Sequence, residues 1–147
     1  MGSRNIKEGQ SVGQSVNFPY AQGGISALGN VSSILIVDED RGVLNQISQS
    51  LAICARQYNI YTAQNGRDAL RVLKTSMVNT LLTALNLSIT QGFELVDYAK
   101  TYYPDIRLFV MSEEDPSAIK KRLDALSIYG YIRKPFRIEM VYSVLRV

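Results

Sequence analysis

The sequence predicts a three-layer α/β fold, in which a five-stranded parallel sheet lies between two layers of helices. Two observations lead to this prediction. Short apolar runs typical of buried parallel strands recur from residue 33 onward, and each is followed by a segment with apolar residues at helical spacing. Strands that alternate with helices are joined by right-handed crossovers, so they are parallel and helices cover both faces of the sheet.

The composition is that of one globular domain and excludes several kinds of chemistry. The chain has 147 residues, of which 46% are apolar and 20% charged, with a net charge of +3. No apolar run has the length of a membrane span. The single cysteine, Cys54, excludes an internal disulfide, and we expect a cytoplasmic protein. Histidine, the commonest general base and metal ligand, does not occur.

Residues 1–30 differ in composition from the rest of the chain. Six of the ten glycines fall in this stretch, together with many serines, glutamines and asparagines. Such a composition does not bury enough apolar surface to offset the entropy lost on ordering. We therefore expect a flexible leader over residues 1–30 and one folded domain over residues 31–147.

The first half of the domain contains two strands and two helices. The run SILIV at 33–37 is a buried strand, and three acidic residues follow it. The segment NIYTA at 59–63 is the second strand. Apolar residues at helical spacing indicate a helix between these strands, Val43, Leu44, Ile47, Leu51 and Cys54. A shorter helix over 65–76 has an inner face of Ala69, Leu70, Val72 and Leu73.

The third strand, at 78–84, leads through a loop to the third helix. This helix covers 92–103, begins at Gly92 and is stopped by Pro104. Its expected inner face consists of Leu95, Val96, Ala99 and Tyr102.

Two further strand and helix pairs complete the domain. The fourth strand covers 106–111, and the helix over 115–126 has Asp115 as its N-cap and Pro116 at its first position. The fifth strand covers 128–133. A last helix over 136–147 has an expected inner face of Phe136, Met140, Val141 and Val144. The order of elements predicts a flavodoxin-like, doubly wound sheet.

In such a sheet, sites lie at the carboxyl ends of the strands, near the point where the strand order reverses. The residues at these ends are therefore the candidates for function. They are Asp38, Glu39 and Asp40 after the first strand, Ala84 at the end of the third, Ser112 after the fourth and Lys134 after the fifth.

These residues and their spacing resemble the receiver domain of two-component response regulators. The likeness covers residues 32–147 and rests on five motifs in the same order, ILIVDED, NGRDAL, LNLSITQGFEL, FVMS and YIRKPF. The resemblance implies a phosphorelay signalling domain and not an enzyme. Its expected partners are a histidine kinase or phosphotransfer protein and an output domain or downstream protein, with a homodimer as a further possibility.

In this family an aspartate eight residues before a glycine accepts the phosphoryl group. Counting back from Gly92 gives Ala84, so the resemblance implies that the reactive carboxylate is missing. A methyl group supplies no nucleophilic oxygen for phosphoryl transfer. Thr83 belongs to the opposite face of the strand, and Ser88 lies too far along the loop to replace the carboxylate.

The resemblance also implies a Mg²⁺ site, formed by Asp38, Glu39 and the carbonyl of Asn86, and weak or lost without the acceptor carboxylate. Lys134 is the expected fixed positive charge, before a cis bond to Pro135, and Asp38 or Glu39 is expected to hold it. Ser112 and Tyr131 match the hydroxyl and the aromatic ring of the family's switch.

Several alternatives remain open on the sequence. Ala84 is explained equally by natural loss of the acceptor or by deliberate substitution. An expected interaction face on the fourth helix, fifth strand and fifth helix carries Tyr131 with the basic residues Lys120, Lys121, Arg122, Arg133 and Arg137, although ordinary surface charge explains them as well. The competing functions are a phosphatase-like enzyme and a nucleotide-binding flavodoxin-like domain. The enzyme is disfavoured because the chain has no histidine, no cysteine at a strand end and no glycine-rich phosphate loop. The nucleotide-binding domain is disfavoured because the acidic first turn would repel phosphate.

Overall fold

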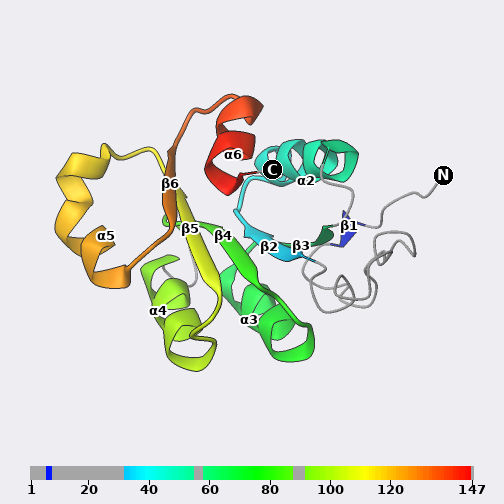
Figure 1. The fold of residues 1–147 in the computed structure, drawn as a ribbon, viewed down its shortest axis with the longest axis horizontal. Coiled ribbons are helices and arrows are strands. Elements are labelled where there is room, and N and C mark those ends of the chain that lie inside the picture. The colour runs from blue at the N-terminus through cyan, green and yellow to red at the C-terminus, as the bar shows by residue number, and fades with distance from the viewer. Residues whose placement is uncertain (1–5, 8–31, 55–57, 88–91, 147) are drawn as a thin grey trace.

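The computed structural model describes residues 6–7, 32–54, 58–87 and 92–146, which form one parallel sheet with helices on both sides (Figure 1). The order of strands in the sheet is β1-β3-β2-β4-β5-β6. Their bounds are β1 Ile6–Lys7, β2 Ser33–Val37, β3 Asn59–Ala63, β4 Thr80–Ala84, β5 Arg107–Ser112 and β6 Gly130–Arg133. All five pairs of neighbouring strands are parallel, as predicted.

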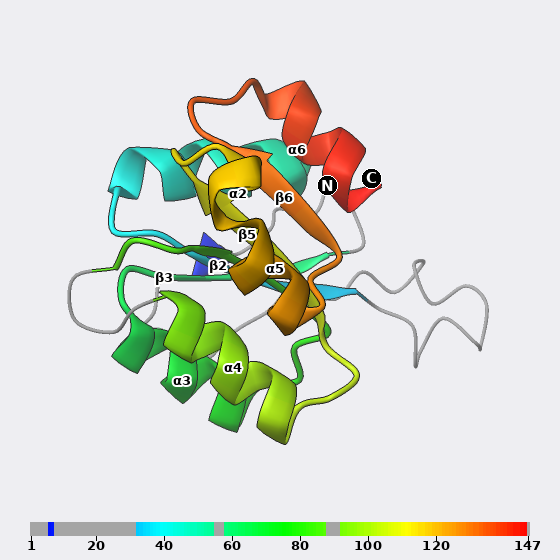
Figure 2. The same cartoon turned by 90° about the vertical axis from the view of Figure 1, so that its left-hand side faces the viewer.

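The helices form the two outer layers. They are α2 Arg41–Cys54, α3 Gly66–Thr75, α4 Gly92–Tyr102, a 3-10 turn η2 Pro116–Ile119, α5 Lys120–Leu126 and α6 Ile138–Leu145. Helices α2 and α6 pack together on one face of the sheet, whereas α3, α4 and α5 cover the other face (Figures 1 and 2). Within the described part of the chain, no helix combines the length and the apolar character that a membrane crossing requires.

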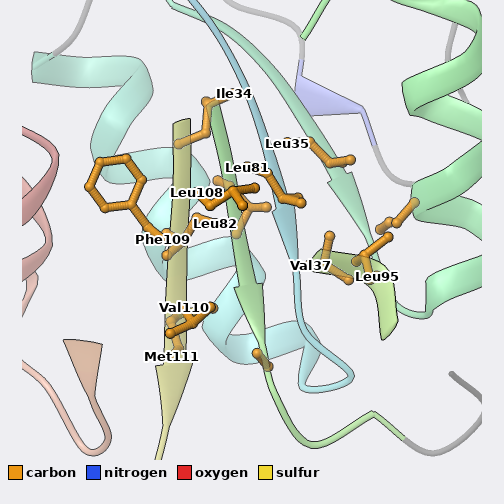
Figure 3. Packing of buried hydrophobic residues seen from close by; sticks show 14 of the residues in the cluster. Ile34, Leu35, Val37, Leu81, Leu82, Leu95, Leu108, Phe109, Val110 and Met111 are labelled. Atoms are coloured by element: carbon orange, nitrogen blue, oxygen red, sulfur yellow. The ribbon is translucent and has the colours of Figure 1, made fainter. Parts of the chain in front are cut away.

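The core lies on both faces of the central strands. Every residue of β2 and β4 is buried, and β5 is buried after its first residue. Leu81, Leu82, Leu108 and Val110 project from adjacent strands among the other core side chains (Figure 3). Burial of strands on both faces explains why they appear in the sequence as continuous apolar runs and not as alternating patterns.

Local signals place most helix boundaries. Asn65 caps α3, because its Oδ1 accepts a hydrogen bond from the Asp68 backbone N–H at 2.8 Å. Asp115 caps the next segment as predicted, with its carboxylate accepting from the Ser117 N–H at 2.9 Å. The predicted helix over 115–126 is divided, however. Ile119 has φ −120° and ψ 21°, so a 3-10 turn precedes α5.

Two predicted inner-face residues point outward. Tyr102 is 63% exposed at the last position of α4, and Met140 is 51% exposed on α6. Tyr102 instead stacks on Tyr98, with ring centroids 4.6 Å apart. Both residues continue the helical spacing of their neighbours, so the spacing alone did not distinguish them from the buried positions.

Strand β1 was not predicted. Ile6 and Lys7 lie within the segment expected to be a flexible leader, and they pair in parallel with Ile60 and Tyr61 of β3. The sheet therefore has a sixth, two-residue strand at the edge beside β3 (Figure 1).

Candidate functional site

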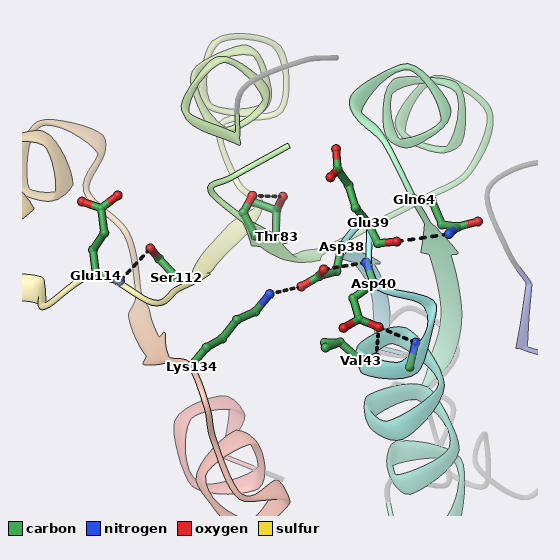
Figure 4. A network of polar contacts seen from close by, with 11 residues as sticks. Asp38, Glu39, Asp40, Val43, Gln64, Thr83, Ser112, Glu114 and Lys134 are labelled. Atoms are coloured by element: carbon green, nitrogen blue, oxygen red, sulfur yellow. Dashed lines mark hydrogen bonds and ion pairs between the residues drawn. The ribbon is translucent and has the colours of Figure 1, made fainter. Parts of the chain in front are cut away.

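The carboxyl ends of four neighbouring strands bring the predicted polar residues together. Asp38 follows β2, Ala84 ends β4, Ser112 ends β5 and Lys134 follows β6. Because β2, β4, β5 and β6 are adjacent and parallel, these four positions lie along one edge of the sheet. Figure 4 shows Asp38, Ser112 and Lys134 at this edge.

Lys134 reaches across this edge to Asp38. Its Nζ donates to Oδ2 of Asp38 in a short ion pair, and only 5% of the Asp38 side chain and 18% of the Lys134 side chain are exposed. The other carboxylate oxygen of Asp38 accepts a hydrogen bond from the Asp40 backbone N–H at 2.9 Å. The sequence allowed either Asp38 or Glu39 as the partner of Lys134, and in the structure this partner is Asp38.

The other two acids of the run have different positions. Asp40 accepts hydrogen bonds from the backbone N–H groups of Gly42 at 2.8 Å and Val43 at 3.4 Å, so it caps the start of α2. The Glu39 side chain is exposed, and its carboxylate lies apart from the Asp38–Lys134 pair (Figure 4). Asp38 is thus the acid of this run that is buried at the strand ends.

Ala84 occupies the centre of the row and is 3% exposed. The neighbouring Thr83 is fully buried, and its hydroxyl donates to the carbonyl of Ala84 at 2.9 Å. Its oxygen is therefore engaged with the backbone. Ser88 lies outside the described residues.

Gly92 explains the fixed spacing between the end of β4 and the next helix. Its backbone N–H donates to the Leu85 carbonyl at 3.0 Å. A Cβ atom on Gly92 would lie 2.2 Å from the Ala84 carbonyl oxygen and 2.5 Å from the Leu85 Cα. The start of α4 therefore packs directly on the backbone of residue 84, which requires glycine at this position.

Ser112 and Tyr131 are joined through one residue that sequence reasoning missed. The buried Ser112 Oγ accepts from the backbone N–H of Glu114 at 3.1 Å, and the Tyr131 hydroxyl donates to the carbonyl of Glu114 at 2.5 Å. Residue 114 contributes only backbone groups to these contacts, so its side-chain type gave no signal. Lys134 and Pro135 are joined by a cis peptide bond, as the resemblance implies.

The residues present do not fit a well-formed Mg²⁺ site. Both oxygens of Asp38 are already engaged, and the Glu39 side chain and Asn86 are exposed. Among the described residues, no group of three acidic, histidine or cysteine side chains is arranged to hold a metal ion. The predicted Mg²⁺ ligands therefore remain Asp38, Glu39 and the Asn86 carbonyl, of which only Asp38 is a buried carboxylate.

The predicted basic face is divided into separate parts. Lys120 pairs with Asp124 at 2.7 Å on α5, and the Arg122 guanidinium lies 3.8 Å from the centroid of the Phe93 ring. Lys121 is exposed on the same helix. Arg133 lies 3.5 Å from Asp115. Hydrogen bonds from the Ser117 hydroxyl and backbone, together with the charge of Arg133, lower the pKa of the Asp115 carboxyl.

A hollow of about 700 Å³ lies where β6 meets the start of α6. Three members of the predicted face line it, Tyr131, Arg133 and Arg137. They are joined there by residues that the sequence had not grouped with them, Pro116, Pro135, Phe136, Glu139 and Met140. Phe136 could have indicated this surface, because this aromatic residue follows directly on Lys134 and Pro135. The predicted face thus contains a hollow lined by apolar and aromatic side chains together with two arginines and one glutamate.

Comparisons with known proteins agree with this geometry. Residues 34–146 match the family described as the response regulator receiver domain. The heme response regulator HssR of Staphylococcus aureus (strain Newman) is 28% identical over 114 residues, which are 77% of this chain and 50% of that protein. The chain therefore spans about half the length of the curated relatives that it matches.

Solved structures share the fold at lower identity. The chemotaxis response regulator CheY4 of Vibrio cholerae has a TM-score of 0.72 and 24% identity, covering 79% of this chain and 97% of that chain. A CheY-like receiver domain protein from Methanospirillum hungatei has a TM-score of 0.72 and 21% identity, covering 79% and 91%. These matches show that the architecture of the sheet and helices is the same.

Proposed function

The chain belongs to the response regulator receiver family, and from this premise we propose that it is a receiver domain that does not accept a phosphoryl group. Receiver domains are signalling domains of two-component systems, and their partners are histidine kinases or phosphotransfer proteins and output domains. The proposal concerns what this chain retains of that activity. One observation carries it, the buried methyl group of Ala84 at the centre of the strand ends.

Phosphoryl transfer requires a nucleophilic oxygen in line with the phosphorus, and the pocket offers none in a suitable place. The Thr83 hydroxyl is buried and donates to a backbone carbonyl. Ser112 is at the position of the hydroxyl that binds the phosphoryl oxygens in the family. Here its oxygen accepts a hydrogen bond from the Glu114 backbone N–H. The carboxylate of Asp38 is held by Lys134.

The same contacts support a pocket that is stable without a metal ion. Family members generally bind Mg²⁺ at the acceptor site, where it offsets the charge of several carboxylates. Here Lys134 and Asp38 neutralise each other directly, so the pocket carries no pair of unopposed buried acids. We infer that Mg²⁺ binding by Asp38, Glu39 and the Asn86 carbonyl is weak or lost.

Signalling would then depend on contacts with other proteins. The hollow between β6 and α6 supports this, because it combines apolar and aromatic side chains with the charged residues Arg133, Arg137 and Glu139. The acidic partners of Arg133 and Arg137 are the exposed residues Asp115 and Glu139, which an acidic segment of a partner protein can replace. Chemical-shift changes caused by a cognate kinase or downstream protein should map to this hollow. Changes confined to α2 or α3 would contradict this part of the proposal.

Acetyl phosphate with Mg²⁺, followed by intact mass measurement, tests the central claim on this chain and on Ala84→Asp. We expect no added phosphoryl mass on the unsubstituted chain, because no side chain replaces the acceptor. An adduct on that chain would refute the proposal. An adduct on Ala84→Asp alone would show that the remaining residues still support the reaction, and an inert Ala84→Asp would show that the pocket has lost more than one group.

A further inference from the structure

The two edge regions of the sheet, at β6 and at β3, differ in how they are protected against pairing with another chain. Strand β6 begins with Gly130, carries the exposed charge of Arg133 and is followed by Pro135. Strand β3 has the sequence NIYTA, without a charge, a proline or a glycine. An uncharged edge strand is a template for pairing with another chain, because its outward N–H and C=O groups need partners. The β3 edge therefore depends on another element to cover it.

The directions of the backbone N–H and C=O groups in β3 show which residues require a hydrogen-bonding partner at the outer edge. The Asn59 N–H donates to the Ser32 carbonyl at 2.8 Å, and the Ala63 carbonyl accepts from the Asp38 N–H at 3.1 Å, so both residues are directed toward β2. Because successive residues in a strand direct their backbone groups to opposite sides, Ile60 and Thr62 are directed toward the outer edge. The outer edge thus has two residues with their donors and acceptors facing away from β2.

Strand β1 lies against these two residues. Lys7 pairs opposite Tyr61, between Ile60 and Thr62. In a parallel pair, only one of two opposite residues directs its N–H and C=O toward the other strand. Tyr61 directs its N–H and C=O toward β2, so in this pair the N–H and C=O of Lys7 point to β3. The N–H and C=O of Ile6 point away from β3. The cover therefore depends mainly on the backbone of Lys7.

The cover is small in comparison with the edge. It has two residues and is joined to β2 through residues 8–32, and of the five residues of β3 it lies opposite only Ile60 and Tyr61. The same edge is also self-complementary. If two copies pair antiparallel about a two-fold axis at Tyr61, Ile60 of each copy lies opposite Thr62 of the other, and both exchange their backbone hydrogen bonds.

We propose that Ile6–Lys7 covers a self-pairing sheet edge, and that β3 binds a second copy of this chain when the cover is displaced. The product is a dimer with one continuous sheet. A tethered strand competes well with a free partner, because the tether gives it a high effective concentration. The unsubstituted chain therefore keeps its β3 edge covered. This inference rests on the sheet topology and does not depend on the phosphorylation state of the pocket.

Three full-length variants test the proposal by light scattering. Lys7→Pro removes the N–H that points to β3, and we expect this chain to gain a species with the mass of two copies. Lys7→Ala keeps that N–H, and Ile6→Pro removes one that points away from β3, so both should match the unsubstituted chain. No change in Lys7→Pro would overturn the proposal, and so would an equal mass increase in all three variants.

Hydrogen exchange at the amides of Ile60 and Thr62 identifies the surface that is used. In the Lys7→Pro chain we expect these amides to exchange quickly at low protein concentration and to become protected as the dimer forms. A dimer in which both amides stay unprotected would use another face and would refute the assignment. Circular dichroism of each variant checks that the core, which these substitutions do not touch, remains folded.

Discussion

Asp38 and Lys134 form an ion pair that is almost out of water, and each charge depends on the other. A buried carboxylate without its partner loses the interaction that offsets its desolvation. Asp38 also accepts a hydrogen bond from Asp40, which fixes its orientation where the chain leaves β2. The pair therefore stabilises the turn between β2 and α2 as well as the position of Lys134.

We expect Lys134→Met to lower the free energy of unfolding by about 1–3 kcal/mol, because Asp38 then remains buried without a cation. This is less than for a fully buried pair, since water reaches part of Lys134. Urea denaturation of Lys134→Met, Asp38→Asn and the double variant measures the coupling. The control is Lys120→Met, whose exposed pair with Asp124 should contribute less than about 0.5 kcal/mol. Additive effects at positions 38 and 134 would contradict the prediction.

The strand-end positions in the sequence were sufficient to predict Asp38, Ala84, Ser112 and Lys134 as neighbours. The predicted partner of Lys134 was open between two acids, because sequence alone does not give the direction of side chains in a turn. Glu114 could not be predicted for a related reason. It acts through its backbone N–H and C=O, which every residue except proline possesses.

Among the elements, the connection from β4 to α4 is the most constrained. The first residue of α4 touches the last residue of β4, which leaves no volume for a side chain on Gly92. The spacing between residues 84 and 92 is therefore fixed by packing as well as by the loop.

We expect Gly92→Ala to destabilise the fold by about 2–4 kcal/mol, because its Cβ would overlap with backbone atoms that cannot rotate away. Gly42→Ala is the matched control at the start of another helix. There the new Cβ would lie 3.1 Å from a side-chain oxygen of Asp40, which can move. Thermal and urea unfolding compare the two variants. Equal stability of Gly92→Ala and Gly42→Ala would contradict the packing argument.

The sequence predicted the central elements better than their ends. The predicted and observed bounds of β3 agree at residues 59 and 63. Strand β6 begins at Gly130 and not at residue 128, since Ser127 adopts a left-handed conformation with φ 53° and the chain is still turning there. Strand β1 had no periodic signal, because two residues are too few to show alternation.

At the strand ends, the buried carboxylate of Asp38 is balanced by the charge of Lys134. Replacing the methyl of Ala84 by a carboxylate would add a second buried acid beside Asp38, at a position only 3% exposed. Lys134 cannot neutralise both, so the folded state would become dependent on another positive charge.

We expect Ala84→Asp to lower the melting temperature in the presence of a chelator, by roughly 5 °C per kcal/mol of destabilisation. Mg²⁺ should restore it with increasing concentration, because binding to the folded state alone stabilises that state. Ala84→Asn, which has the same shape without the charge, should respond little. A thermal-shift titration measures all three chains. If the unsubstituted chain gains as much from Mg²⁺ as Ala84→Asp, the inferred loss of the metal site is wrong.

The Glu114 backbone N–H donates to the Ser112 hydroxyl, and the Glu114 carbonyl accepts from the Tyr131 hydroxyl. The backbone of this residue thus connects the strand end with the surface. We expect a protein that binds at Tyr131 to shift the Glu114 backbone, and with it Ser112, because one residue carries both hydrogen bonds. If residue 84 accepts no phosphoryl group, as proposed, a contact at the surface is the remaining way to change the position of Ser112.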